Sequence, residues 1–404
     1  MTDTAAMNRE LDWPSRTNEE WRRTSVDVFH LQKRRVAQKT KSTPKSLPLE
    51  GFSGRLLFQD GVLVSASLDA ALAAKGVVFG PLSESPDKVA PYLSAGLAQS
   101  DTLASSGHYS RIEFGAFLQV PDRVICELPF LIEVVEGRSE ALVVPHWVVT
   151  VGTASEAALL LHQSSRNGAS FTIDSAASVD LGEGSNFKFS ELQNFSSSVA
   201  VLDHSLATLR RDTQFFHWCA PIGGKVVKTR YDFNLTGEGA SVRTHGLYFG
   251  VKDQHKDMLI NLTHVAPRCT SYALYKGAVR DRARTIFQGL IEVKPTAGKT
   301  DAYLSNKNLI LNNGARADSL PQLKIDTNDV KCSHGSTTGK VNEDEIFYLT
   351  TRGFSRAEAM ILIAQGLFTE LVDEAPDFFR AEVELLVSCA LGADAEQGTC
   401  QDKL

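Results

Sequence analysis

The middle of the chain, from about residue 136 to 335, contains many short stretches rich in Val, Ile, Phe and Tyr. Gly, Asn, Asp and Ser separate these stretches, and they show little helical periodicity. Apolar runs bounded by turn-forming residues predict β-strands. So long a succession of strands restricts the fold to a solenoid or a sandwich.

A weak internal repeat runs through this middle region. It reads Val-Gly-Thr-Ala-Ser at 151–155, Leu-Gly-Glu-Gly-Ser at 181–185 and Leu-Thr-Gly-Glu-Gly-Ala-Ser at 235–241. Each copy is a glycine-containing turn that leads into a strand-like segment. The intervals between copies are irregular, so the repeat alone leaves both architectures open. No βαβ unit surrounds these turns, so they are not dinucleotide-binding loops.

The composition divides the chain into residues 1–135, 136–340 and 341–404. The first region is mixed, with a short helix capped by Asn18, a hairpin over 55–64 that turns at Asp60-Gly61, and helices over 69–75 and 85–98. A basic stretch over 33–48 has no aromatic residue that could stack on a base, so it predicts a solvated linker.

The last region predicts three helices. Asn342 and Ser355 are in N-cap positions, with a glutamate three residues after each. Apolar residues recur at spacings of three and four in two runs, which are Ile361, Ala364, Leu367, Phe368 and Leu371, and Phe378, Ala381, Leu385 and Cys389. Such faces cover the core of their own domain or fill a groove on a partner, and both interpretations stay open. The tail from Gly392 is predicted to fray.

Charge and cysteine usage indicate a soluble cytoplasmic protein. The 404 residues carry a net charge of −6 with a pI near 6.0, which argues against nucleic acid or an anionic membrane as the main partner. The six cysteines are scattered, which fits a reducing compartment. The N-terminus lacks the apolar core of a secretory signal, and no apolar run approaches the ~18 residues of a membrane span.

Cys332 and His334 are the strongest chemical signal, because they lie two residues apart in a strand-like context, Asp-Val-Lys-Cys-Ser-His-Gly. Side chains alternate along a strand, so both project from one face. A sulfur and a nitrogen ligand suit iron, copper or zinc, but two ligands do not complete a metal site. From the residues alone, a buried cysteine beside a hydrogen-bonded histidine is the more economical interpretation.

Two other motifs carry less weight. Gly298-Lys299-Thr300 lacks the first glycine of a phosphate-binding loop, because residue 293 is Val, and Pro295 lies inside the segment. We therefore expect no ATP site of that type. Asp253, His255 and Asp257 are expected to alternate on one strand face, where they could ligate a metal.

The 329–335 motif, with Phe347-Tyr-Leu-x-x-Arg-Gly downstream, resembles the C-terminal core of the SufB/SufD family of the SUF iron–sulfur cluster assembly machinery. The similarity continues upstream and is strong over about 255–371; its matches include Ile-Phe-Gln-Gly at 286–289, Lys-Thr-Asp-Ala at 299–302 and Asp-Ser-Leu-Pro-Gln-Leu at 318–323. So many dispersed matches in the order of the family make the resemblance specific.

Four features resemble SufD-type rather than SufB-type chains. SufB-type chains carry a cysteine where this chain has Ala317, and tend to have glutamate where it has Gly335. They are usually also longer at the N-terminus. The segment Glu-Glu-Trp-Arg-Arg-Thr at 19–24 is similar to the Glu-Glu-Trp-Lys-Tyr-Thr opening of SufD-type chains.

The resemblance implies a mainly β chain with a right-handed parallel β-helix core, an N-terminal mixed region and C-terminal helices. It further implies a non-catalytic scaffold in the bacterial cytoplasm that pairs with a SufB-like subunit, or with itself when isolated. A SufC-like ABC ATPase would dock on the helices through Phe354, Ile361, Leu367, Phe368 and Leu371. His334, with Cys332 second, would then ligate iron or a transient cluster at the SufB–SufD interface.

Two enzymatic alternatives remain. A β-helix polysaccharide-active enzyme would need catalytic residues clustered on one solenoid face, and such enzymes are usually secreted. A metal-dependent hydrolase would use Cys332, His334 and the residues around His255.

Overall fold

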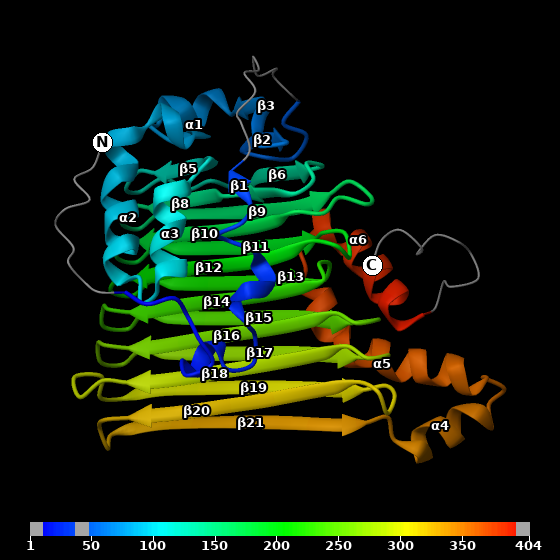
Figure 1. The fold of residues 1–404 in the computed structure, drawn as a ribbon. Coiled ribbons are helices and arrows are strands. Elements are labelled where there is room, and N and C mark those ends of the chain that lie inside the picture. Colours follow the sequence, from blue (N-terminus) through cyan, green and yellow to red (C-terminus); the bar gives the residue numbers. More distant parts are fainter. Residues whose placement is uncertain (1–10, 37–47, 393–404) are drawn as a thin grey trace.

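The computed structural model describes residues 11–36 and 48–392 of the chain. Its centre is a parallel β-helix of about eight turns, in which successive strands alternate between two facing sheets (Figure 1). The parallel β-helix that the resemblance implied is confirmed.

The sheets are called A and B. Sheet A contains, from the N-terminal end, β4 (Val78–Pro81), β5 (Phe114–Val120), β8 (Pro145–Val151), β10 (Thr172–Leu181), β12 (Ala200–Leu209), β14 (Val226–Leu235), β16 (His255–His264), β18 (Arg284–Val293) and β20 (Arg316–Ile325), with β1 (Arg35–Val36) and β7 (Ala141–Val143) beside this path. Sheet B contains β3 (Val62–Leu68), β2 (Gly54–Gln59), β6 (Phe130–Glu136), β9 (Glu156–Ser165), β11 (Asn186–Asn194), β13 (Gln214–Pro221), β15 (Ser241–Gly250), β17 (Thr270–Val279), β19 (Thr300–Ile310) and β21 (Val330–Lys340).

The repeated turns of the sequence stack directly on one another. Val151, Leu181, Leu209 and Leu235 occupy one column, because each is paired with the next across neighbouring strands of sheet A. The glycine after Leu181 is required by this stacking, since a Cβ on Gly182 would lie 2.8 Å from the carbonyl carbon of Gly152. The sequence repeat therefore marks successive coils.

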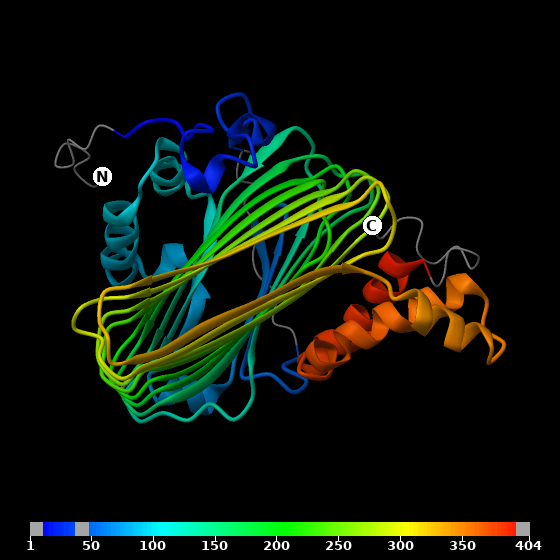
Figure 2. The same ribbon diagram turned by 90° about the horizontal axis from the view of Figure 1, so that it is seen from below.

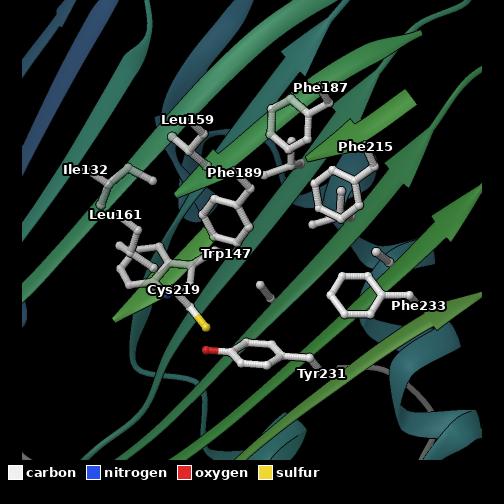
Figure 3. Close-up of a cluster of buried hydrophobic side chains, with 14 of the residues drawn as sticks. Ile132, Trp147, Leu159, Leu161, Phe187, Phe189, Phe215, Cys219, Tyr231 and Phe233 are labelled. Atoms are coloured by element: carbon white, nitrogen blue, oxygen red, sulfur yellow. The ribbon is translucent and has the colours of Figure 1, made fainter. Parts of the chain in front are cut away.

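The space between the two sheets, here called the lumen, is filled with apolar side chains. Figure 3 shows part of this core, where Phe187 and Phe215 stack with their ring centroids 5.7 Å apart. These two side chains come from neighbouring strands, β11 and β13, and are paired in register. Each coil thus buries its inward side chains against those of the next coil.

The two ends of the solenoid differ. At the N-terminal end, β3 pairs antiparallel with β2, and β4 pairs antiparallel with β5, so short reversed strands cap the parallel coils. At the other end, within residues 11–36 and 48–392, β20 has only β18 as a sheet neighbour, and β21 has only β19. These two long strands therefore leave their outer edges unpaired, and this end is called the open end.

The C-terminal helices α4 (Glu343–Thr350), α5 (Arg356–Asp373) and α6 (Asp377–Leu391) follow β21. Helices α5 and α6 cover the outer face of sheet B, away from the N-terminal helices (Figure 2). The rings of Phe249 and Phe368 lie 4.4 Å apart, and Trp218 Nε1 donates to the carbonyl of Leu371 at 2.9 Å. Most of the apolar face of these helices is thus buried against their own β-helix.

An N-terminal segment crosses the outer face of sheet A. It contains the short helices η2 (Glu19–Trp21) and η3 (Val26–Phe29), and Trp21 packs over the ammonium group of Lys228 at 5.0 Å. Thr24 Oγ1 donates to Asp257 Oδ2 at 2.5 Å, and Lys228 Nζ lies 3.2 Å from the same carboxylate oxygen. Lys228 Nζ also donates to the carbonyl of Glu20 at 2.9 Å, so hydrogen bonds to this buried ion pair hold the segment on the sheet.

The remaining N-terminal elements confirm several local predictions. The hairpin turns at Asp60 and Gly61, both with positive φ, and helices α1 (Ala70–Ala74) and α2 (Pro86–Gln99) form as expected. The short helices α3 (Leu103–Arg111) and η4 (Leu82–Glu84) were not expected. Asn18 precedes η2, but its side chain accepts a hydrogen bond from Ser15 N instead of capping that helix.

Two expectations need correction, and two others fall wholly or mostly outside the described residues. The solenoid sheets begin at β5 and β6, before the expected boundary at residue 136. On α6 the buried residues are Phe379, Val383, Leu386, Val387, Cys389, Ala390 and Leu391, whereas Phe378 and Ala381 are exposed, so the expected face was wrong for those two. Most of the linker predicted over 33–48, and the tail beyond Gly392, fall outside the described residues. Within the described ranges, the helices are too short or too polar to cross a bilayer.

Candidate site at the open end of the solenoid

The last coil presents the ends of the lumen columns to solvent. In sheet A, Val293 of β18 pairs with Ile325 of β20, and Ile291 of β18 pairs with Leu323 of β20. Ile325 and Leu323 are therefore the last residues of two columns whose preceding residues are buried. Val293 and Ile291 are fully buried, but Ile325 and Leu323 are each 38% exposed. No further coil covers them, so apolar lumen side chains are accessible here.

His334 ends the corresponding column of sheet B. Its neighbours in register are Leu304 on β19 and then Ala273 on β17, both buried in the lumen core. Gly335 faces the opposite side of β21, because a Cβ there would lie 3.1 Å from the hydroxyl of Tyr303, an exposed residue. His334 is therefore a lumen-side residue that is exposed at the open end.

Cys332 lies on the same lumen side, below Ala302, and packs partly against the main core. The structure thus confirms that Cys332 and His334 share one face of a strand. Burial raises the pKa of the Cys332 thiol, and the nearby carboxylate of Asp301 raises it further. The thiol is therefore protonated at neutral pH and must lose a proton before it can bind a metal.

Hydroxyl and amide groups continue this surface at the corner between β20 and β21. Ser336 Oγ donates to Ser319 Oγ at 2.8 Å, and Ser319 Oγ donates to Asn306 Oδ1 at 2.7 Å. Asn306 is fully buried and donates to Tyr248 OH at 2.9 Å. This chain of hydrogen bonds fixes the two end strands to each other across the lumen.

No complete metal site forms from the residues that the structure describes. Three or more His, Cys, Asp or Glu side chains with suitable geometry do not come together anywhere in residues 11–36 and 48–392. Cys332 and His334 could supply two ligands, so a metal bound between them needs at least one more from outside this part of the chain.

The alternative group around His255 does not form as expected. Asp253 lies in the turn before β16, so it does not share a strand with His255 and Asp257. His255 Nε2 lies 2.8 Å from Thr24 Oγ1, and Asp257 is held by Thr24, Lys228 and Gln288. These side chains anchor the N-terminal segment.

Several other histidines have polar partners. His204 Nε2 lies 2.8 Å from Asp232 Oδ2, and His217 Nε2 lies 2.9 Å from Glu191 Oε1 inside the lumen. His264 Nε2 lies 2.9 Å from Ser271 Oγ, and burial lowers the pKa of His264 to about 4. Cys219 is buried near His217. These contacts fit structural roles.

The expected ATPase-docking residues divide into two groups. Phe354 is 41% exposed, and Ile361 and Leu367 are half-buried. Phe368 and Leu371 are fully buried against sheet B, so they cannot lie on a free docking surface, and the expectation is corrected for these two. Sequence reasoning missed the most exposed aromatic residues of the region, Phe347 at 69% and Tyr348 at 58%, because adjacent aromatics on α4 do not form a three-to-four spacing.

Comparisons with known proteins agree on one family. Residues 134–367 match the model of the SufBD core domain, described as SUF system FeS cluster assembly. The iron–sulfur cluster assembly protein SufD of Escherichia coli K12 is 29% identical, over 90% of this chain and 86% of its own length. SufD of Bacillus subtilis 168 is 25% identical over 77% and 72% of the two chains, and a SufBD family protein of Mycobacterium leprae is 33% identical over 45% and 49%.

Proposed function

Since the chain belongs to the SufBD family of the SUF iron–sulfur cluster assembly system and is SufD-type, we propose that it is a non-catalytic scaffold subunit. The open end of the solenoid carries this proposal. Two long edge strands with unpaired main-chain groups invite pairing with another chain. An isolated soluble solenoid ordinarily needs a polar cap at such an end.

The partner at the open end is a SufB-like subunit. Leu323 and Ile325 would be covered by its matching coil, and the free edges of β20 and β21 would continue into its sheets. When the SufB-like subunit is absent, a second copy of this chain occupies the same edges. The resulting homodimer would not supply the SufB-type cysteine that Ala317 replaces.

The cargo held at this junction is iron or a nascent iron–sulfur cluster. His334 supplies the ligand from this subunit, because its imidazole is exposed on the lumen side of the open end, whereas the Cys332 thiol must first be deprotonated. The partner supplies the remaining ligands. Because the site is divided between two chains, moving the chains apart opens it and releases the product.

The C-terminal helices bind a SufC-like ATPase, which supplies the energy for that movement. Its docking surface is the exposed part of α4 and the start of α5, including Phe347, Tyr348, Phe354 and Leu362, all at least 40% exposed. Solvent-exposed aromatic residues grouped in this way are typical of a protein contact.

Co-expression tests the scaffold proposal. The tagged chain should retain SufB-like and SufC-like subunits of the same organism, and the anaerobically purified complex should contain iron and acid-labile sulfide. Leu323→Lys with Ile325→Lys should prevent pairing, because two charges would be buried at the junction. Lys324→Gln is the matched control, since Lys324 lies on the opposite face of β20 and binds Glu292. A complex that assembles equally with all variants would disprove pairing at this end.

A further inference from the structure

A groove of about 530 Å³ lies at the start of β20, at the open end. Its walls come from three separate parts of the chain: the N-terminal segment, strands β18 and β20, and the hydroxyl groups of β21. The residues that carry its chemistry are Arg23, Arg284, Asp318, Ser319, Ser336 and Thr338. The groove is separate from the Cys332–His334 pair.

The charges in this groove do not balance. Arg284 donates to Asp318 Oδ2 through Nε at 3.0 Å and through Nη2 at 2.5 Å, so this carboxylate is already engaged. Arg23 has no carboxylate partner within the described residues, and its Nη1 is buried without a hydrogen-bond acceptor there. Arg23 is half-buried and lines the groove, so its positive charge, which no carboxylate of the described residues balances, favours an added anion there.

The position of Arg23 is fixed by its neighbours. Trp21 is buried against Lys228, and Thr24 is bound to Asp257, so the two sides of Arg23 are tied to sheet A. Glu19 also accepts a hydrogen bond from Gln322 of β20 at 3.3 Å. The N-terminal segment therefore places one uncompensated cation beside the edge at which the proposed partner would add its strand.

We infer that Arg23 and Arg284 form an anion-binding groove whose occupant is a carboxylate side chain of the SufB-like subunit. This inference rests on the proposed pairing at the open end. A guanidinium binds a carboxylate through two parallel hydrogen bonds, and the hydroxyl of Thr338 can donate to the same group, whereas the Ser336 hydroxyl already donates to Ser319. The N-terminal segment is then part of the subunit interface and helps to select an acidic partner edge.

The affinity of the purified chain for the SufB-like subunit tests the inference, measured at low and at high salt. Arg23→Gln should weaken binding about tenfold at low salt, and the difference should shrink at high salt because the lost contact is ionic. Arg22→Gln is the matched control, because Arg22 is exposed on the same segment and carries the same charge. Arg23→Lys keeps the charge without the paired hydrogen bonds and should fall between wild type and Arg23→Gln.

The possible outcomes distinguish the inference about the Arg23 groove from the proposed pairing at the open end. Equal affinity of Arg23→Gln and Arg22→Gln in a complex that otherwise forms would overturn the inference alone. Failure of the wild-type chain to bind the SufB-like subunit would overturn the pairing and the inference together. A third outcome is that inorganic phosphate stabilises the isolated chain saturably, with the effect lost in Arg23→Gln and the subunit affinity of that variant normal. That result would show that the groove binds a free anion, and it would overturn the inference that a partner carboxylate occupies it. Unchanged thermal unfolding of Arg23→Gln would confirm that the segment stays docked.

Discussion

His334 lies directly beneath Leu304 in the parallel register of β21 on β19, yet Leu304 is fully buried and His334 is exposed. The two residues occupy the same lumen column, and only the absence of a following coil separates their environments. A further coil placed on this edge would bury His334 at the junction. The residue is thus positioned for contact with whatever continues the solenoid.

Replacement of His334 by alanine should strongly reduce the iron and sulfide bound by the co-expressed complex, because the proposed ligand of this subunit is removed. Complex assembly and ATPase activity should change little, since the side chain is exposed in the isolated chain. Cys332→Ser should have the smaller effect, because burial keeps that thiol protonated. Iron and sulfide are measured anaerobically for each complex. Normal loading of the His334→Ala complex would make the residue structural.

Phe347→Ala combined with Tyr348→Ala should abolish capture of the SufC-like ATPase in a pull-down without changing the stability of the chain, because both side chains are largely exposed. Phe368→Ala is the contrasting control. It should cost about 3–5 kcal/mol of unfolding free energy through lost core packing. Deleting everything from Phe354 onward is a poor test, since it would uncover the apolar outer face of sheet B. Retained capture by the exposed-face double variant would refute the docking surface.

The coils of the solenoid are partly visible in the sequence. The column through Leu181, Leu209, Leu235 and His264 is separated by 28, 26 and 29 residues, so no fixed period reveals it. One copy lacks the glycine turn, since Arg210 follows Leu209, and another replaces the aliphatic residue with a histidine. The strands were therefore predictable from turns and composition, whereas the solenoid required the family resemblance.

The candidate site was likewise only partly predictable from the sequence. Strand alternation correctly placed Cys332 and His334 on one face, because that property is local. The pairing of Arg23 with a groove formed by β18, β20 and β21 was not predictable, because nearly the whole chain separates these residues and only the fold brings them together. The face of α6 was misplaced because both of its sides carry apolar residues at helical spacing, and packing on sheet B decides which side is buried.

When a cysteine desulfurase and cysteine are supplied, Cys126, Cys219, Cys269 and Cys332 of the isolated chain should accumulate little or no persulfide. Cys126, Cys219 and Cys269 are buried free thiols, and burial raises the pKa of each, while Cys332 is half-buried with a raised pKa as well. The reactive species is the thiolate, which these sites disfavour. Alkylation and mass spectrometry measure the persulfide, with a SufB-like subunit treated in parallel as the positive control. Stoichiometric persulfide on this chain would contradict the assignment of sulfur acceptance to the partner.

His264 should make the solenoid sensitive to acid. Burial lowers the pKa of His264 to about 4, whereas an unfolded histidine titrates near 6.5. Between these values the unfolded chain binds a proton that the folded chain does not, so stability falls as the pH drops from about 6.5 to 4. This one group accounts for about 3 kcal/mol at pH 4.

His264→Gln removes that titration and keeps a polar side chain near Ser271. Urea unfolding of wild type and variant should therefore show an unfolding free energy that falls less steeply for the variant below pH 6.5. Above pH 7 the difference between the two should be constant, because neither form of the protein takes up a proton at this position there. Parallel curves for wild type and His264→Gln across the acid range would show that another group causes the acid sensitivity.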